Sequence, residues 1–393
     1  MSPPEQIPIN LSEGRFSRLE AIEWWDQSRL GAARILVVGA GALGNEIIKN
    51  LALLGAGHLV VVDMDRMELS NLSRSVLFRE SDAGLPKAEC AARGAKSLYP
   101  GIRVRPIVGN ISADVGFGWF RWAQVVVSAV DNREARVFVN SACARLGRPW
   151  IDGGIEVLNG IARGFAPPAT ACYECTMSEL DWDLLNRRRS CSLLAQRAMM
   201  QRGTPTTPTT ASVVAGIQTQ EAVKFLHGRE SLMGKGFVFE GDRHTSYTVA
   251  YPLKPDCPWH DSPAPVVAAR DLSSETPLEV IWKRAAENLG GLDGIDLGRE
   301  VVEELECASC HSSQQVWKLA EKLSETELAC STCGAERSLK FLHSILLGSA
   351  LLKLTARQLG LPAWDVLWAR RGDRQLAMEL AGDEARCLAD GWL

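Results

Sequence analysis

The stretch that decides the fold is "ARILVVGAGALGNEIIKNLALLGAGHLVVVD", residues 33–63. Its run "ILVVG" predicts a buried strand, "NEIIKNLALLG" has helical spacing that stops at Gly55, and "HLVVVD" predicts a second strand. Further on, "AQVVVSAVD" predicts another strand, and "NREARVFVNSACARLG" predicts a helix after it. Strands that alternate with helices form parallel sheets with right-handed crossovers. The sequence therefore predicts an α/β fold with a Rossmann-like, mostly parallel sheet.

The turn after the first strand is rich in glycine. Gly39, Gly41 and Gly44 have the spacing G-x-G-x-x-G between a strand and a helix, where backbone amides can approach a phosphate. Asp63 comes 19 residues after Gly44, at the end of the second strand, where a carboxylate can hold ribose hydroxyls. This pattern predicts a nucleotide site, and alone it would fit a nicotinamide dehydrogenase equally well.

Charged residues beyond Asp63 narrow the choice between candidate ligands. Arg74 and Lys87 flank an apolar "VLF", and "SAVDNREAR" puts Asp131 at the end of a strand, the edge where open parallel sheets bind ligands. Arginine and lysine would neutralise phosphate charge, and Asp131 would hold a metal ion. Together these residues favour ATP with Mg²⁺ over a nicotinamide cofactor.

The same residues carry a family resemblance. The ordered motifs "RFSR", "GAGALG", "DMDRMELSNLSR", "LPKAE" and "VDNREAR" resemble the adenylation domain of ubiquitin-activating enzymes and of their sulfur-carrier relatives, the ThiF/MoeB superfamily. The resemblance runs from about Arg15 to His260. It implies the following ATP-site roles: Gly41 and Asp63 contact ATP, Asn71, Arg74 and Lys87 hold its phosphates, and Asp131 binds Mg²⁺.

The resemblance also implies a partner subunit. Arg18, the second arginine of "RFSR", matches an arginine that reaches into the neighbouring subunit's site, so a homodimer with two active sites is expected. The sequence departs from the family at Ser75, where a glutamine is usual, and we expect a modest effect because the charged groups are intact.

Bulk composition excludes several classes of protein. The chain has 393 residues, 46% of them hydrophobic, and a formal charge of -4, which gives no support to nucleic-acid binding. No apolar run reaches the roughly 18 residues of a membrane span. The first residues also lack the apolar core of a signal peptide. We therefore expect a cytoplasmic protein with neither nucleic acid nor membrane as a partner.

Six of the eleven cysteines form C-x-x-C pairs, which in a cytosolic protein favour zinc over disulfides. Cys257 and His260 share this spacing and would complete a structural zinc site with Cys172 and Cys175. A second, four-cysteine zinc ribbon is predicted from two further pairs with 19 residues between them: Cys307, Cys310, Cys330 and Cys333. The ribbon is either a staple for a small domain or a docking module for a partner protein. Cys90 and Cys143 lie in helical patterns and are expected in the core.

Cys191, in "RRSCSLLAQ", is the candidate nucleophile. Arg187–Arg189 precede it, and positive charge stabilises a thiolate. In the resembled enzymes this interval crosses over the substrate tail. The conjugating branch carries its thioester cysteine there, and some sulfur-carrier enzymes keep a cysteine there for persulfide chemistry. The following "GTPTTPTTAS" is expected to be a flexible hinge.

A proline-rich joint, "PLKPDCPWHDSPAPV", marks the expected domain boundary. We predict an adenylation domain over residues 1–265 and a smaller mixed domain with the zinc ribbon over residues 266–393. In the second domain "SLKFLHSILLGSALLKLTARQLG" is expected to form a long apolar helix, and "WDVLWAR" and "QLAMELAGD" two strands.

Three functional hypotheses follow. The first is an activating enzyme that adenylates a ubiquitin-like protein at its C-terminal tail, forms a thioester on Cys191 and passes it to a conjugating enzyme. The chain resembles activating enzymes of bacterial ubiquitin-like conjugation operons, some of which serve in phage defence. The second is a sulfur-carrier adenylyltransferase for thiamine, molybdopterin or cysteine biosynthesis. The third is an inactive scaffold subunit, which the retained Arg74, Lys87 and Asp131 disfavour.

Overall fold

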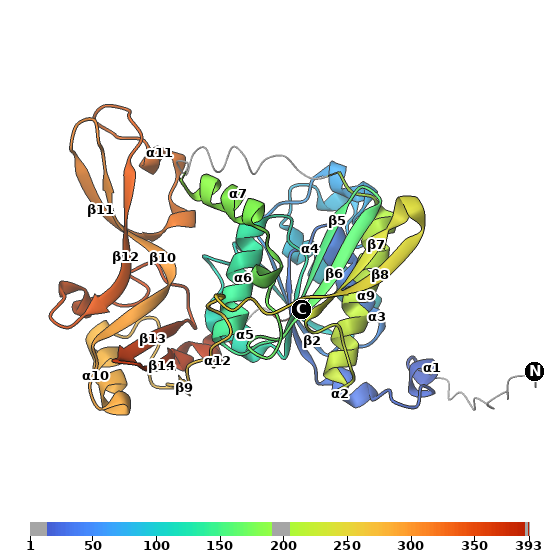
Figure 1. Ribbon diagram of the computed structural model, residues 1–393. Coiled ribbons are helices and arrows are strands. Elements are labelled where there is room, and N and C mark those ends of the chain that lie inside the picture. Colours follow the sequence, from blue (N-terminus) through green and yellow to red (C-terminus); the bar gives the residue numbers. More distant parts are fainter. Residues whose placement is uncertain (1–13, 191–204, 390–391, 393) are drawn as a thin grey trace, which may run out of the picture.

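The protein contains two β-sheets, each with its own helices (Figure 1). The computed structural model describes residues 14–190, 205–389 and 392. The N-terminal lobe holds an eight-stranded sheet, and the C-terminal lobe holds a six-stranded sheet. Among the described residues, no helix combines the length and apolar character needed to span a bilayer.

The larger sheet has the strand order β3-β2-β1-β4-β5-β6-β7-β8. The five strands β3, β2, β1, β4 and β5 are parallel to one another. Strands β6, β7 and β8 extend the sheet as antiparallel strands at one edge. The predicted α/β class with a mostly parallel sheet is confirmed. The strands are β1 (Arg34–Val38), β2 (His58–Asp63), β3 (Arg103–Val108), β4 (Val125–Ser128), β5 (Trp150–Glu156), β6 (Asn159–Phe165), β7 (Lys235–Glu240) and β8 (Thr245–Ala250).

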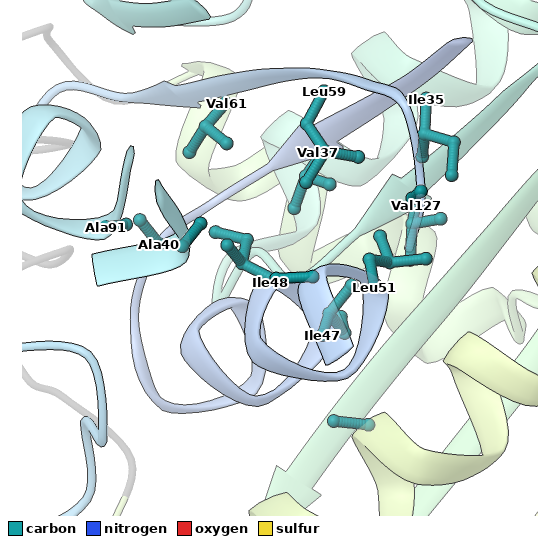
Figure 2. Close-up of a cluster of buried hydrophobic side chains, with 14 of the residues drawn as sticks. Ile35, Val37, Ala40, Ile47, Ile48, Leu51, Leu59, Val61, Ala91 and Val127 are labelled. Carbon is teal, nitrogen blue, oxygen red and sulfur yellow. The ribbon is translucent and has the colours of Figure 1, made fainter. Parts of the chain in front are cut away.

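The central strand β1 is buried on both faces. Ile35 and Val37 pack into the cluster shown in Figure 2, whereas Leu36 and Val38 belong to a second cluster on the other face. Successive side chains of a strand point to opposite faces, so an unbroken apolar run suits a strand covered on both sides. Each such buried side chain contributes about 1.5–3 kcal/mol.

Helices cover both faces of this sheet. On one face α3, α4 and α9 pack together, and on the other α5 and α6 pack against the second cluster. Two short helices, α1 and α2, precede β1, and α7 follows the first C-x-x-C pair. The helices are α1 (Ser17–Glu20), α2 (Gln27–Gly31), α3 (Ala42–Leu53), α4 (Lys87–Leu98), α5 (Phe117–Trp122), α6 (Arg133–Arg145), α7 (Glu179–Ser190) and α9 (Pro208–Leu226).

The expected flexible hinge is wrong over its second half. Thr207 caps α9, with its hydroxyl oxygen accepting from the Thr210 amide at 3.3 Å, and Pro208 opens the helix. The Thr207 and Thr210 hydroxyls also donate to the Val157 carbonyl, each at 3.1 Å. Threonine before a proline is a helix start, so these hydroxyls fix the chain instead of freeing it.

The smaller sheet has the strand order β11-β10-β13-β14-β9, and β12 also pairs with β10. Its pairs are antiparallel except β14 with β9. The two strands predicted in "WDVLWAR" and "QLAMELAGD" are confirmed as β13 and β14. The elements of this lobe are β9 (Val266–Ala268), α10 (Leu278–Leu289), β10 (Gly294–Glu306), β11 (Ser313–Leu319), α11 (Glu325–Leu328), β12 (Ser338–Leu346), β13 (Val366–Arg371), β14 (Arg374–Glu379) and α12 (Glu384–Ala389).

The long helix predicted over residues 338–360 is wrong. The segment begins with β12, turns at Gly348, whose φ is +82°, and continues in a short 3₁₀ helix at Ala350–Lys353. Strand β12 pairs with the long strand β10, from Glu306 opposite Ser338 to Gly294 opposite Leu346. Sheet pairing with a distant strand therefore overrides a local pattern that suits a helix equally well.

A buried ion pair joins the two lobes. The Arg299 guanidinium in β10 donates to both Asp365 oxygens, at 2.9 and 3.1 Å, and to the Val115 carbonyl at 2.6 Å and the Ser112 carbonyl. Asp365 also accepts from the Phe117 amide, at the start of α5, at 2.9 Å. Both charged side chains are almost fully buried, at 1% and 2% exposure. Through these contacts to backbone carbonyl and amide groups of the N-terminal lobe, the pair holds the C-terminal lobe against it.

Trp364 adds a second contact at the same place. It has a φ of +58°, and its ring covers Gly118, where a Cβ would lie 2.4 Å from the indole. Its indole nitrogen donates to Glu379 at 2.7 Å, and Glu379 pairs with Arg121 of α5. The C-terminal lobe is thus fixed to the α5 face of the large sheet.

The substitution Asp365→Asn should destabilise the protein by about 3 kcal/mol, because it leaves Arg299 buried without a countercharge. The matched control is Asp271→Asn, which breaks an exposed pair with Arg284 in the same lobe and should leave the unfolding midpoint unchanged. Urea unfolding followed by tryptophan fluorescence measures both variants. Equal midpoints for the two variants would contradict a structural role for the buried pair.

Candidate nucleotide and metal sites

The glycine turn lies at the carboxyl end of β1 and opens α3. Gly39 has a φ of +95°, and a Cβ there would lie 2.7 Å from the Ala129 carbonyl oxygen at the end of β4. A Cβ on Gly44 would lie 2.0 Å from the Gly39 carbonyl oxygen. Gly41 differs, because it caps α3 and has no atom within 4 Å of its missing side chain. Two glycines therefore serve packing, and Gly41 leaves open space at a helix N-terminus.

Asp63, at the end of β2, fixes this turn. One carboxylate oxygen accepts from the Ala40 amide at 2.7 Å, and the other accepts from the Asp65 amide at 2.8 Å. Burial raises the pKa of the Asp63 carboxyl, and the two amide hydrogen bonds act against that rise. A carboxylate accepts about four hydrogen bonds, so these two leave capacity for a ribose hydroxyl.

Asn45 is a site residue that the sequence analysis missed. Its amide nitrogen donates to the Ala40 carbonyl at 2.6 Å and the Gly41 carbonyl at 3.1 Å, and its oxygen accepts from the Leu77 amide at 2.9 Å. The side chain is fully buried. It therefore ties the glycine turn to the segment that carries Arg74. A polar residue on the apolar face of a predicted helix was the available signal.

The cationic residues lie on the segment between β2 and α4. Lys87, the first residue of α4, forms an ion pair with Asp65 at 2.8 Å. Arg74 ends a 3₁₀ helix (Leu69–Ser73) and donates to the Ser70 carbonyl at 3.0 Å. Asn71 accepts from the Glu68 amide at 3.0 Å within the same turn. Lys87 is thus held near the end of β2 through Asp65, whereas Arg74 is held within its own turn.

Asp131 lies in the turn between β4 and α6, directly after Ala129 and Val130. Its side chain is exposed, and one oxygen accepts from the Asn132 side chain at 3.3 Å. Because Ala129 contacts Gly39, this turn and the glycine turn share one edge of the sheet. An exposed carboxylate beside a phosphate-binding turn fits Mg²⁺, which binds through one or two carboxylates plus phosphate oxygens.

Two predicted residues lie outside this cluster. Arg18 is exposed on α1, and the neighbouring Phe16 ring contacts Gly55, beyond the far end of α3 from Gly41. A helix of 12 residues is about 18 Å long, so Arg18 does not reach the glycine turn of its own chain. Cys191 lies outside the described residues, and α7 ends one residue before it.

The first predicted metal set is brought together. The ligand atoms of Cys172, Cys175, Cys257 and His260 all lie within 4.8 Å of one another. The Cys172 sulfur lies 3.5 Å from that of Cys257, and the Cys175 sulfur lies 3.0 Å from the His260 ring. Tetrahedral zinc bonds of about 2.3 Å put sulfurs about 3.8 Å apart, so the set fits one ion. Burial raises the pKa of the Cys172 and Cys257 thiols, so a cation is needed to hold them as thiolates.

The four-cysteine set is brought together as well. The pairs lie at the adjacent ends of β10 and β12, and the four sulfurs lie within 4.8 Å of one another. Cys307 lies 3.5 Å from Cys333, and Cys310 lies 3.6 Å from Cys330. A hydrogen bond from Ser312 and backbone amides lower the pKa of Cys330 to about 5. This set also fits a tetrahedral zinc ion. Cys90 and Cys143 are buried in helices, as expected.

Known proteins share this organisation. The chain is 41% identical over 157 residues to the Nedd8-activating enzyme E1 catalytic subunit of Drosophila melanogaster, covering 37% of this chain and 35% of that protein. It is 35% identical over 233 residues to the SAMP-activating enzyme E1 of Haloferax volcanii, covering 59% of this chain and 82% of that enzyme. The chain thus spans about a third of the length of the first relative and most of the second.

Solved structures show the same fold. The crystal structure of E. coli MccB with ATP has a TM-score of 0.53 and 23% identity, covering 64% of this chain and 75% of that chain. At this identity the likeness concerns the fold alone. Residues 15–258, more than half of the sequence, match the ThiF family. The chain therefore belongs to the ThiF family.

Proposed function

We propose that this protein activates a ubiquitin-like protein by adenylating its C-terminal carboxylate with ATP. The observation that carries the proposal is the shared sheet edge, where an open helix N-terminus at Gly41 lies beside Asp63 and the turn that bears Asp131. Membership of the ThiF family and relatives named as E1 activating enzymes support the same chemistry. The retained charged residues disfavour an inactive scaffold.

The proposed roles are those that the family resemblance implies. Amides at the start of α3 bind phosphate, Asp63 holds the ribose, and Asn71, Arg74 and Lys87 contact the triphosphate. Asp131 would hold Mg²⁺, which supplies positive charge to the phosphates. A carboxylate oxygen of the substrate attacks the α-phosphorus, the bond to the bridging oxygen breaks, and pyrophosphate leaves with its electron pair. The product is an acyl-adenylate.

Lys87 is the cation best prepared for this step. Its side chain is 14% exposed, whereas its partner Asp65 is 55% exposed, so the pair sits at the border of the site. Because Asp65 is largely exposed, its pairing with Lys87 is weakened by solvent, so a phosphate can replace Asp65 at low cost. Lys87 would then neutralise charge on the leaving pyrophosphate.

The protein acts as a homodimer in this proposal. Arg18 lies at the opposite end of α3 from its own glycine turn, on the peripheral helix α1 (Figure 1). In this proposal Arg18 serves the neighbouring subunit's site, because it does not reach the glycine turn of its own chain. Two copies related by a two-fold axis would each complete the other's triphosphate site.

The second step uses Cys191. Its thiolate attacks the acyl carbon of the adenylate, AMP leaves, and the ubiquitin-like protein is held as a thioester for transfer to a conjugating enzyme. The alternative is a sulfur-carrier enzyme, in which the adenylate ends as a thiocarboxylate. The alignment with the SAMP-activating enzyme covers most of that enzyme's length. Both branches are tested below.

Residues 1–265 and 266–393 are proposed as the two domains, each with a structural zinc ion. The first ion pins the segment around Cys257 to the N-terminal lobe, and the second closes the end of β10 and β12. We further propose that the ribbon docks a partner protein, that the protein is cytoplasmic, and that it serves a bacterial conjugation pathway of the phage-defence kind, by analogy with the enzymes that it resembles.

The substitution Gly41→Ala should weaken ATP binding by at least about 10-fold, or about 1.4 kcal/mol, without lowering the melting temperature. The added methyl group meets no protein atom but occupies the space proposed for phosphate. The control is Gly216→Ala in α9, where a methyl group also meets nothing within 4 Å and ATP affinity should stay unchanged. Isothermal titration calorimetry measures both. Unchanged ATP affinity in Gly41→Ala would contradict the proposal that this turn binds the phosphates.

Mixing the protein with ATP, Mg²⁺ and a ubiquitin-like protein encoded beside its gene should give a covalent adduct, seen by intact mass without reductant and removed by thiol. The variant Cys191→Ala should still form the adenylate but lose the adduct, and Asp131→Ala should lose both. Adenylate without any adduct in the wild type would move the protein to the sulfur-carrier branch.

Purified protein should contain two zinc ions per chain, one for each ligand set. Cys257→Ser and Cys330→Ser should each reduce the zinc content to about one ion per chain. A four-ligand site loses most of its zinc affinity when one thiolate is removed. Cys387→Ser, outside both sets, should keep two. Elemental analysis combined with native mass spectrometry measures the content. A chain free of zinc, or loss of both ions from one substitution, would contradict two independent sites.

A further inference from the structure

The exposed Asp131 carboxylate has a buried support beneath it. Arg136, in the first turns of α6, reaches back toward the chain that precedes the helix. One terminal nitrogen donates to the Val130 carbonyl at 2.6 Å and to the Gly153 carbonyl at 3.0 Å. The guanidinium thus holds the peptide group directly before Asp131 against strand β5.

Arg136 is itself fixed by a buried carboxylate. Its Nε donates to Asp152 at 3.0 Å, and Asp152, on β5, has no exposed side-chain surface. Arg163, the cross-strand neighbour on β6, pairs with the other Asp152 oxygen at 2.5 Å. A carboxylate gripped from two sides by planar guanidinium groups has little freedom to move.

Both ends of the turn are also fixed. Gln218 of α9 donates to the Ser128 carbonyl at 2.8 Å, and Asn132 caps α6 by accepting from the Ala135 amide at 2.8 Å. Between these points the Val130 carbonyl accepts from Arg136. Among the described residues, the Asp131 side chain has one hydrogen bond, from Asn132, so the placement of the backbone largely determines where this carboxylate can lie.

We propose that Arg136 is a positioning residue for the metal carboxylate Asp131, with Asp152 as its anchor. The inference rests on the proposed function and deepens it, since Asp131 holds the metal there. Arg136 touches neither nucleotide nor metal; it sets the Val130–Asp131 peptide so that the carboxylate meets a cation on the triphosphate. Supports of this kind typically change metal affinity by about 10–100-fold when they are removed.

The test measures Mn²⁺ binding to the full-length protein with a non-hydrolysable ATP analogue, by the electron paramagnetic resonance signal of free Mn²⁺. Arg136→Gln should raise the Mn²⁺ dissociation constant by at least about 10-fold. The matched control Arg133→Gln removes a partly exposed arginine of the same helix, which pairs with Asp181 at 2.6 Å, and should leave the constant unchanged.

Two further variants separate positioning from stability. Arg136→Lys keeps a buried positive charge near Asp152 but lacks the planar fork, so it should fold and show an intermediate loss of Mn²⁺ affinity. Arg163→Gln weakens the same buried pair without touching the Val130 carbonyl. It should lower the melting temperature while Mn²⁺ affinity stays near that of the wild type.

The outcomes are distinguishable. Wild-type binding that Asp131→Asn abolishes, together with unchanged Mn²⁺ affinity in both Arg136 variants, would overturn the positioning role and leave the proposed function intact. Wild-type protein that binds no Mn²⁺ with the analogue, or binding that Asp131→Asn leaves unaltered, would overturn the proposed metal site itself and the positioning role with it.

Discussion

The glycine turn at Gly39 approaches the end of β4 so closely that the two segments form one edge of the large sheet. The Gly39 position lies against the Ala129 carbonyl, and Gly44 lies against the Gly39 carbonyl, with no room for a side chain at either place. This packing puts the N-terminus of α3 and the turn bearing Asp131 on one edge of the parallel sheet. A helix N-terminus and an exposed carboxylate therefore meet there, as the proposed triphosphate with its cation would require.

The face behind this edge is unusually well anchored. Helix α6 starts beside Asp131, and further along its Asn140 donates to Glu174 at 3.2 Å and accepts from the Tyr173 amide at 3.0 Å, next to the first zinc-ligand pair. The C-terminal lobe covers the adjoining helix α5 through Arg299 and Trp364. Contacts near both ends thus hold helix α6, and they also hold the backbone that carries Arg136.

Sequence reasoning recovers the parts that local pattern determines. The apolar run of β1, the glycine spacing and the charged residues at strand ends predict the large sheet and its nucleotide-binding edge. The spacing of cysteines predicts both ligand sets, because it depends on short knuckles. The same reasoning does not predict contacts between residues that lie far apart in the sequence. The first part of the segment 338–360 is strand β12 because it pairs with the distant strand β10. The roles of Asn45, Arg136 and Arg299 depend on contacts that no local period encodes.

We propose that this sheet edge joins a protein carboxylate to the α-phosphate of ATP. It is tested most directly by exchange of labelled pyrophosphate into ATP, measured with a ubiquitin-like protein that ends in a free carboxylate and with the same protein amidated at its C-terminus. The account predicts exchange with the free carboxylate and none with the amide, because only the carboxylate oxygen can attack phosphorus reversibly. Absence of exchange with both, or equal exchange with both, would contradict it.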